Sequence, residues 1–169
     1  SMGTRAHEVA MYILFDQPLG YLCDSPTEYR KFSSVIEFIS RIPASWDQTL
    51  PLSAEVGEYA VIAKRKGDEW FVAAMTNGEA RDVEVDFSFL PEGEFFAEVI
   101  RDNSSTDANA KVLTREIVAV TNQSKNSYSL SPGGGAAIYI SDLVLGTAEE
   151  TQKSFSVSQN AAGTQLTIE

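Results

Sequence analysis

Two runs of β-forming residues decide the fold of this chain: EYAVIAKRK at residues 58–66 and EWFVAAMT at residues 69–76. Both are rich in the β-branched and aromatic side chains that favour a pleated, partly buried surface. The link between them contains Gly67 and Asp68, which are typical of a tight turn. The sequence therefore predicts a β-hairpin at the centre of the fold.

The residues after this hairpin continue as short strands separated by turns. Asn77-Gly78 is a turn signal, and in the following RDVEVDF (81–87) apolar residues alternate with acidic ones. Further strands are predicted at residues 94–102, 113–120, 127–130 and 136–141. Turn signals about every ten residues are typical of an antiparallel β-sandwich or a barrel-like domain. The fold class is therefore mainly β, with this domain at residues 46–141.

Residues 4–42 have helical spacing instead. A first helix is predicted over residues 5–16, with Thr4 as its N-cap and apolar residues almost all round. Such a helix must be buried on more than one side. Ser25-Pro26 is a start signal for a second helix, and a third amphipathic stretch covers residues 34–42.

The composition excludes several classes of partner. The chain has 13 Lys and Arg against 24 Asp and Glu, a formal net charge of −11, so nucleic acid and anionic lipid are repelled. The plainer reading of this charge is solubility. No apolar run reaches the length of a membrane span or a signal peptide. Ser1-Met2, with or without Gly3, has the form of an expression remnant that would replace any native targeting signal.

The candidate nucleophiles and bases are few. His7 is the single histidine and Cys23 the single cysteine, so an imidazole-rich zinc site and an intrachain disulfide are excluded. We expect His7 to make a polar contact to a neighbouring domain, and Cys23 to be a small buried residue. No catalytic residue is assigned in this chain.

Three other patterns are weak signals for a site. Residues 102–107 (DNSSTD) have loosely spaced oxygen ligands but lack the glycine and terminal glutamate of a calcium loop, so a solvated turn is preferred. Pro132-Gly133-Gly134-Gly135 lacks the lysine of a phosphate loop and is predicted to be a tight connection. Acidic pairs such as Glu55/Glu58 and Asp82/Glu84 suit glycoside hydrolysis, but nothing singles one out. No metal site is assigned.

Aromatic side chains offer a different function, the binding of sugars. Trp46 and Trp70 are the candidates for a stacking platform. Alternation places Trp70 and Phe71 on opposite faces of one strand, so one of them points away from a single core. The preferred explanation is that both faces of the sheet are covered or that one meets another domain.

Several motifs together resemble glycoside hydrolase family 97. These are Thr4-Arg5-Ala6-His7-Glu8, Cys23-Asp24-Ser25-Pro26, Trp46-Asp47-Gln48-Thr49, the run from Val56 to Asn77, and Pro132-Gly133-Gly134-Gly135. The likeness covers residues 4–141. Gln48 replaces the usual acidic residue, Ala136 stands where an aromatic often follows, and the segment after Asp142 has no recognised counterpart.

The resemblance implies a longer enzyme that cleaves α-glucosides or α-galactosides, with inversion or retention in different subgroups. Family members have an upstream β-sandwich and a (β/α)8 barrel that hold the catalytic carboxylates and calcium. Residues 4–42 then correspond to two or three helices at the end of the barrel. The C-terminal domain is associated with packing and oligomerisation. A bacterial periplasmic or cell-surface location is also implied.

Three functions remain open at this point. The leading one is a structural domain that contacts the upstream barrel and forms a homo-oligomer; the alternatives are a carbohydrate-binding module and an enzyme in its own right. Residues 142–169 are expected to be a linker-like segment with a possible hairpin around residues 160–163.

Overall fold

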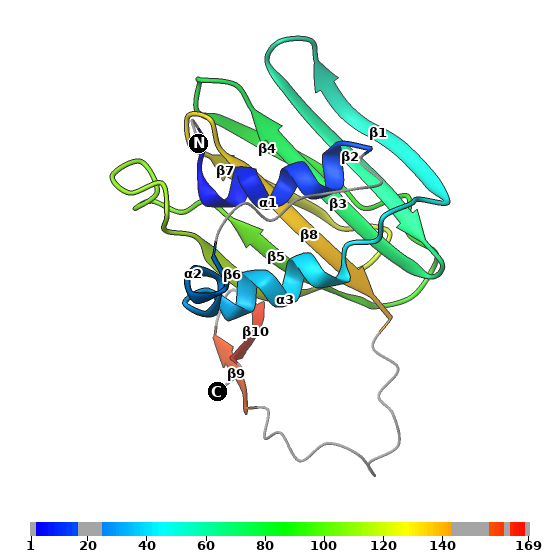
Figure 1. Cartoon of the computed structure of the whole chain (residues 1–169). Helices are drawn as coiled ribbons and strands as arrows, with labels where there is room; N and C mark the ends of the chain where they lie inside the picture. The colour runs from blue at the N-terminus through cyan, green and yellow to red at the C-terminus, as the bar shows by residue number, and fades with distance from the viewer. Residues whose placement is uncertain (1–2, 17–24, 143–155, 161–162, 168–169) are drawn as a thin grey trace.

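The computed structural model describes residues 3–16, 25–142, 156–160 and 163–167. Its centre is an antiparallel six-stranded sheet with the order β1-β2-β3-β8-β5-β6 (Figure 1). The strand bounds are β1 (Gln48–Glu55), β2 (Tyr59–Lys66), β3 (Glu69–Thr76), β5 (Phe95–Arg101), β6 (Thr114–Val120) and β8 (Gly135–Ser141). β1 and β6 end the order, so the mainly β, antiparallel prediction is confirmed and the sheet does not close into a barrel.

The two faces of this sheet carry different layers. A two-stranded ribbon of β4 (Arg81–Asp86) and β7 (Lys125–Leu130) covers one face, and α1 (Arg5–Leu14) and α3 (Ser33–Arg41) cover the other (Figure 1). The short helix α2 (Pro26–Arg30) precedes α3. Trp70 belongs to the core under the ribbon and Phe71 to the core under the helices. The expectation of two covered faces is therefore confirmed.

Local chemistry explains where α1 begins. The Thr4 hydroxyl oxygen accepts a hydrogen bond from the His7 backbone N–H at 3.1 Å, which is the N-cap that the sequence predicts. Ala6, Val9, Ala10 and Ile13 are at most 2% exposed against the sheet. On the other side Met11 and Tyr12 are only partly buried, and Phe15, just past the helix, is 42% exposed.

The sequence did not predict β1. Its residues QTLPLSAE contain Pro51, which cannot donate a ladder hydrogen bond and is tolerated at a sheet edge. The pairing of β1 with β2 shifts register between Pro51 and Ser53, as in a β-bulge. A proline and a bulge also make an edge strand a poor template for further strand pairing.

The C-terminal segment contributes a separate ribbon. β9 (Ser156–Asn160) and β10 (Gly163–Thr167) pair antiparallel, and β10 lies beside β6 (Figure 1). Cys23 and residues 143–155 lie outside the described part of the chain. Within that part, no helix has the length and apolar run needed to cross a bilayer.

Candidate functional site

The helix-covered face of the sheet carries polar and aromatic side chains that lie side by side on neighbouring strands. Lys64, Phe71, Tyr139 and Glu98 are direct register neighbours across β2, β3, β8 and β5. We call these four residues the cross-strand row. The row has a charged residue at each end and two aromatic rings between them. It lies under the helices and forms part of the contact between the helical layer and the sheet.

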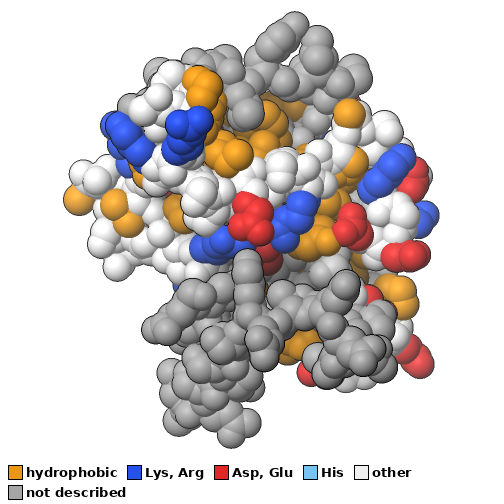
Figure 2. Space-filling view, turned by 60° about the horizontal axis from the view of Figure 1, so that its bottom comes forward, with side chains coloured by type: hydrophobic (Ala, Val, Ile, Leu, Met, Phe, Trp, Pro, Cys, Tyr) orange, Lys and Arg blue, Asp and Glu red, His pale blue; other side chains and the backbone are white. Residues whose placement is uncertain are grey.

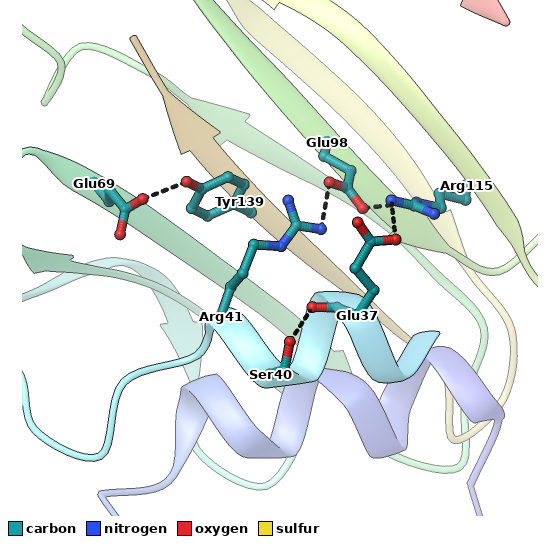
Figure 3. Close-up of polar contacts among 7 residues, drawn as sticks. All are labelled: Glu37, Ser40, Arg41, Glu69, Glu98, Arg115 and Tyr139. Atoms are coloured by element: carbon teal, nitrogen blue, oxygen red, sulfur yellow. Dashed lines mark hydrogen bonds and ion pairs between the residues drawn. The ribbon is translucent and has the colours of Figure 1, made fainter. Parts of the chain in front are cut away.

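Glu98 is the ionic centre at one end of the row. It is 6% exposed, and its two carboxylate oxygens accept hydrogen bonds from Arg41 on α3 and Arg115 on β6, each at 2.7 Å (Figure 3). Arg115 also lies 3.6 Å from Glu37, one turn from Arg41 on α3. Two guanidinium groups neutralise the buried carboxylate, and the ion pair with Arg41 fastens α3 to the sheet.

Tyr139 is the next polar group along the row. Its hydroxyl donates to Glu69, and the Arg41 guanidinium lies 4.7 Å from its ring centroid (Figure 3). Burial first, and then the Glu69 carboxylate, raise the pKa of Tyr139 to about 12. A phenol with this pKa holds its proton at neutral pH, so Tyr139 serves as a hydrogen-bond donor in this seam.

Lys64 closes the other end of the row. It is 1% exposed, and its Nζ donates to the Leu14 carbonyl at 3.1 Å and to Asp16 at 2.6 Å. The ammonium group therefore satisfies a carbonyl at the C-terminal end of α1, where a positive charge is favourable. Lys64 and Glu98 thus secure α1 and α3, respectively.

The two tryptophans predicted for sugar binding lie on opposite faces of the sheet. Trp70 is 6% exposed in the core, with its ring centroid 4.7 Å from that of Phe89. Trp46 is half-buried and packs edge-on against Phe71 at 5.3 Å. The structure therefore does not bring Trp46 and Trp70 together as one platform.

A hollow of about 220 Å³ does lie beside Trp46. Its lining residues are Asp16, Ala44, Ser45, Trp46 and Thr49. The hollow thus combines one aromatic ring with a carboxylate and two hydroxyl groups.

His7 makes its contact inside this chain. Its ring Nδ1 lies 3.2 Å from the Gly134 carbonyl oxygen, in the turn between β7 and β8. A carbonyl only accepts, so Nδ1 carries the proton in this contact. The expectation that His7 reaches a missing neighbour is therefore corrected: the turn predicted at Pro132-Gly133-Gly134-Gly135 is its partner.

Three of the acidic candidates contact side chains other than the acidic partner predicted for them. Glu58 accepts from Arg81 at 2.6 Å, Asp82 accepts from the Ser129 hydroxyl, and Glu84 lies 3.7 Å from Lys125. The Asp102 carboxylate accepts hydrogen bonds from backbone amides of the β7–β8 turn, whereas Asp107 is exposed. The two carboxylates of the DNSSTD segment therefore do not form one site. Within the described ranges no group of three His, Cys, Asp or Glu residues is placed to hold a metal.

The polar residues that matter most to this site were not singled out from the sequence. Glu98 and Lys64 are each buried and bonded to residues at least 50 positions away. One signal was available for both, since Glu98 interrupts the apolar run FFAEVI and Lys64 directly follows the apolar run AVIA within its strand. A charge at an interior strand position is an indication of a buried partner.

Comparison with known proteins gives matches that cover most of the chain. Residues 45–141 match the family model described as "Glycosyl-hydrolase 97 C-terminal, oligomerisation". The chain is 37% identical over 140 residues to a retaining alpha-galactosidase of Bacteroides thetaiotaomicron, covering 83% of this chain and 21% of that protein. A probable retaining alpha-galactosidase of Streptomyces bingchenggensis is 29% identical over 97 residues, 57% of this chain and 15% of that one.

Solved structures give the same result. A Glycoside Hydrolase Family 97 enzyme from Pseudoalteromonas sp. strain K8, in complex with acarbose, superposes with a TM-score of 0.80 and 30% identity, over 84% of this chain and 23% of that one. A beta-arabinopyranosidase shares the fold, with a TM-score of 0.65 and 21% identity over 82% and 21% of the two chains. The chain spans about a fifth or less of the curated relatives it matches. It belongs to glycoside hydrolase family 97 and contains that family's C-terminal oligomerisation domain.

Proposed function

We propose that this chain is the non-catalytic C-terminal portion of a longer α-glycosidase, in which it supports the upstream barrel and self-associates. The match of residues 45–141 to a C-terminal oligomerisation domain carries the proposal. The buried charges support it, because Glu98 and Lys64 are committed to holding helices on the sheet. Groups committed in this way stabilise an architecture and are poorly placed for turnover.

In this proposal residues 4–42 are the edge of the catalytic barrel and residues 46–141 are the accessory domain. The helix α1 supports the division, because its sheet side is buried while Met11 and Tyr12 are only partly covered. Phe15 and Phe32, which are 42% and 38% exposed, add apolar surface near the helices. A barrel packed on this side would bury that surface.

Self-association is tested by light scattering on this chain over a hundredfold range of concentration. We expect a dimer or larger assembly that persists in the double variant F15S/F32S, because Phe15 and Phe32 face the barrel in this proposal and lie outside the oligomerisation domain. V56S is the control for a surface substitution, because Val56 is fully exposed at the β1–β2 hairpin tip, away from the helices. A wild-type chain that is a strict monomer, with α1 ordered, would overturn the proposal.

For the parent enzyme we propose hydrolysis of α-galactosides with retention, since two relatives are named retaining alpha-galactosidases. α-Glucosides are the alternative. The catalytic residues and the calcium site belong to the upstream domains, and the enzyme acts in the bacterial periplasm or at the cell surface. Full-length enzyme should release nitrophenol from nitrophenyl α-galactoside faster than from the α-glucoside, and this chain alone should release none. The reverse preference, or activity of the chain alone, would overturn these assignments.

The hollow beside Trp46 favours a second candidate, a carbohydrate-binding role. A half-buried indole next to a carboxylate and hydroxyl groups suits the stacking and hydrogen bonding of one sugar ring. Calorimetry with melibiose and maltose tests this, and W46A should abolish the heat of binding. W70A is not a suitable control, because Trp70 is part of the core. The control is V56A, because Val56 is fully exposed and does not line the hollow. Absence of binding by the wild-type chain would remove this candidate.

A further inference from the structure

The Asp102 carboxyl group is the most deeply buried acid that the site above does not use. Asp102 is 1% exposed, and its Oδ2 accepts hydrogen bonds from the backbone N–H groups of Ser131 at 3.1 Å and Gly135 at 3.0 Å. The Thr4 hydroxyl also donates to this carboxyl. Its other oxygen, Oδ1, is buried and has no hydrogen-bond partner among the described residues.

These bonds join three segments that are distant in sequence. Asp102 follows β5, Ser131–Gly135 form the β7–β8 turn, and Thr4 caps α1. Two further contacts run between the last two segments: Thr4 N–H donates to the Gly133 carbonyl at 3.0 Å, and the His7 ring donates to the Gly134 carbonyl at 3.2 Å. The start of α1 is therefore held by the turn that Asp102 organises.

The glycines of the turn are required by this close approach. A Cβ at position 134 would collide with Asp102 Oδ2 and lie 2.5 Å from the Ser131 carbonyl oxygen. A Cβ at position 135 would lie 2.8 Å from the His7 Cα. Both distances are well inside normal van der Waals contact, so only glycine allows the turn, the carboxyl and the first turn of α1 to meet.

None of the described charged residues is an ion-pair partner of Asp102. From α1, His7 faces it at longer range, and the Arg5 guanidinium is bonded to the Lys111 carbonyl. Arg101, the preceding residue, donates to the Asp102 main-chain carbonyl at 3.1 Å and to Glu116. The β7–β8 turn and the neighbouring Ala74 and Thr76 of β3 carry no charge. Burial therefore dominates and raises the pKa of Asp102 above its ordinary value.

We propose that the Asp102 carboxyl is a proton-sensitive clasp that fastens the first turn of α1 to the β7–β8 turn, and that the clasp is tighter when the acid is protonated. Proton uptake removes a buried charge that has no counter-ion among the described residues. The two backbone amides favour the charged form but offset only part of the cost of burial, and Oδ2 still accepts from them after protonation. The inference concerns two parts of one chain and stands whether or not the domain self-associates.

The sign of the effect follows from linkage. Because the pKa of Asp102 is raised on folding, its stabilising contribution is fully present below the unfolded value and is lost as pH rises through the folded value. Most carboxylates in ion pairs act in the opposite direction. Asp86 is an example, since Lys125 and the Ser88 amide lower its pKa to about 2. The variants D102N and D86N separate the pH dependence due to Asp102 from that due to an ion-paired carboxylate.

The experiment is amide hydrogen exchange on this chain between pH 7 and about pH 3.5, a window that includes the ordinary aspartate pKa of about 3.9, corrected for intrinsic exchange rates. We expect protection of the His7 and Gly135 amides in the wild type, relative to D102N, to rise as pH falls, by up to about tenfold for each unit of pKa shift. Asparagine keeps one acceptor oxygen for the two amides and carries no charge, so D102N should fold. D102A removes the acceptor and should lower protection of the Gly135 amide about fivefold or more at every pH.

The control variant is D86N, which should leave the pH dependence at His7 and Gly135 as in the wild type. Identical pH dependence of protection in the wild type and D102N would overturn the proton-sensitive clasp. Unchanged protection at His7 in D102A would overturn its role in holding α1. Light scattering on the same samples reports the oligomeric state. A failure of the oligomerisation proposal is therefore seen separately from a change in amide protection.

Discussion

Arg41 on α3 lies 2.7 Å from Glu98 on β5, and this ion pair links the helical layer to the sheet beneath it. Arg115 on β6 reaches the other oxygen of the same carboxylate at the same distance. The mixed basic and acidic side chains on this side of the molecule, with apolar ones between them, are visible in Figure 2. The pair stabilises the junction between the helical layer and the sheet, because neither charge can leave it without cost to the other.

Removal of the Glu98 charge should therefore loosen α3. We expect E98A to lower the free energy of unfolding by about 3–5 kcal/mol, because two guanidinium groups lose their shared buried partner. The measurement is urea unfolding followed by circular dichroism. E37Q is the control, since Glu37 is a mostly exposed partner of Arg115 at 3.6 Å and should contribute at most about 1 kcal/mol. Equal effects of E98A and E37Q would contradict the role given to Glu98.

Replacement of Lys64 by methionine tests how α1 is held at its other end. Methionine keeps most of the buried volume but cannot donate to the Leu14 carbonyl, so we expect K64M to cost about 1–3 kcal/mol. Exchange of the Phe15 amide, which bonds the Met11 carbonyl in the last turn, should accelerate. The matched variant K66M alters an exposed lysine of the same strand and should leave this amide unchanged.

Truncation of Phe71 tests the packing between the helices and the sheet. Phe71 is fully buried and contacts the rings of Trp46 and Tyr139 at 5.3 and 5.1 Å. F71A should lower stability by about 3–5 kcal/mol and shift the tryptophan fluorescence, because Trp46 loses its edge contact. V56A, at a fully exposed position, should change stability by less than about 0.5 kcal/mol. A stable F71A with native fluorescence would show that the helical layer does not depend on this ring.

Alanine at Gly134 tests the space requirement of the β7–β8 turn. The new Cβ would meet Asp102 and the Ser131 backbone, so we expect a loss of at least about 1–3 kcal/mol in thermal or urea unfolding. Gly78 offers the matched control, because a Cβ there has no neighbour within 4 Å. G78A should be neutral or slightly stabilising, since alanine restricts the unfolded chain. A G134A variant as stable as G78A would mean that the turn can move away from Asp102.

The strands were predictable because their information is local. Runs such as EWFVAAMT and RDVEVDF combine β-forming residues with alternation, and the observed β3 and β4 agree with them within one residue. The Thr4 cap and the helical spacing after it likewise predicted α1, whose observed end at Leu14 falls two residues short of the prediction. β1 escaped prediction because Pro51 conceals an edge strand.

The sequence by itself determined most of the strand and helix segments, with β1 the exception, and the family to which the motifs point. The tertiary structure alone decided that Arg41 meets Glu98, 57 residues away, that Lys64 reaches back 50 residues to Leu14, and that Asp102 meets Gly135 across 33 residues. The physical reason is that periodicity reports which face of an element is apolar, whereas the partner of a buried charge depends on how distant elements pack.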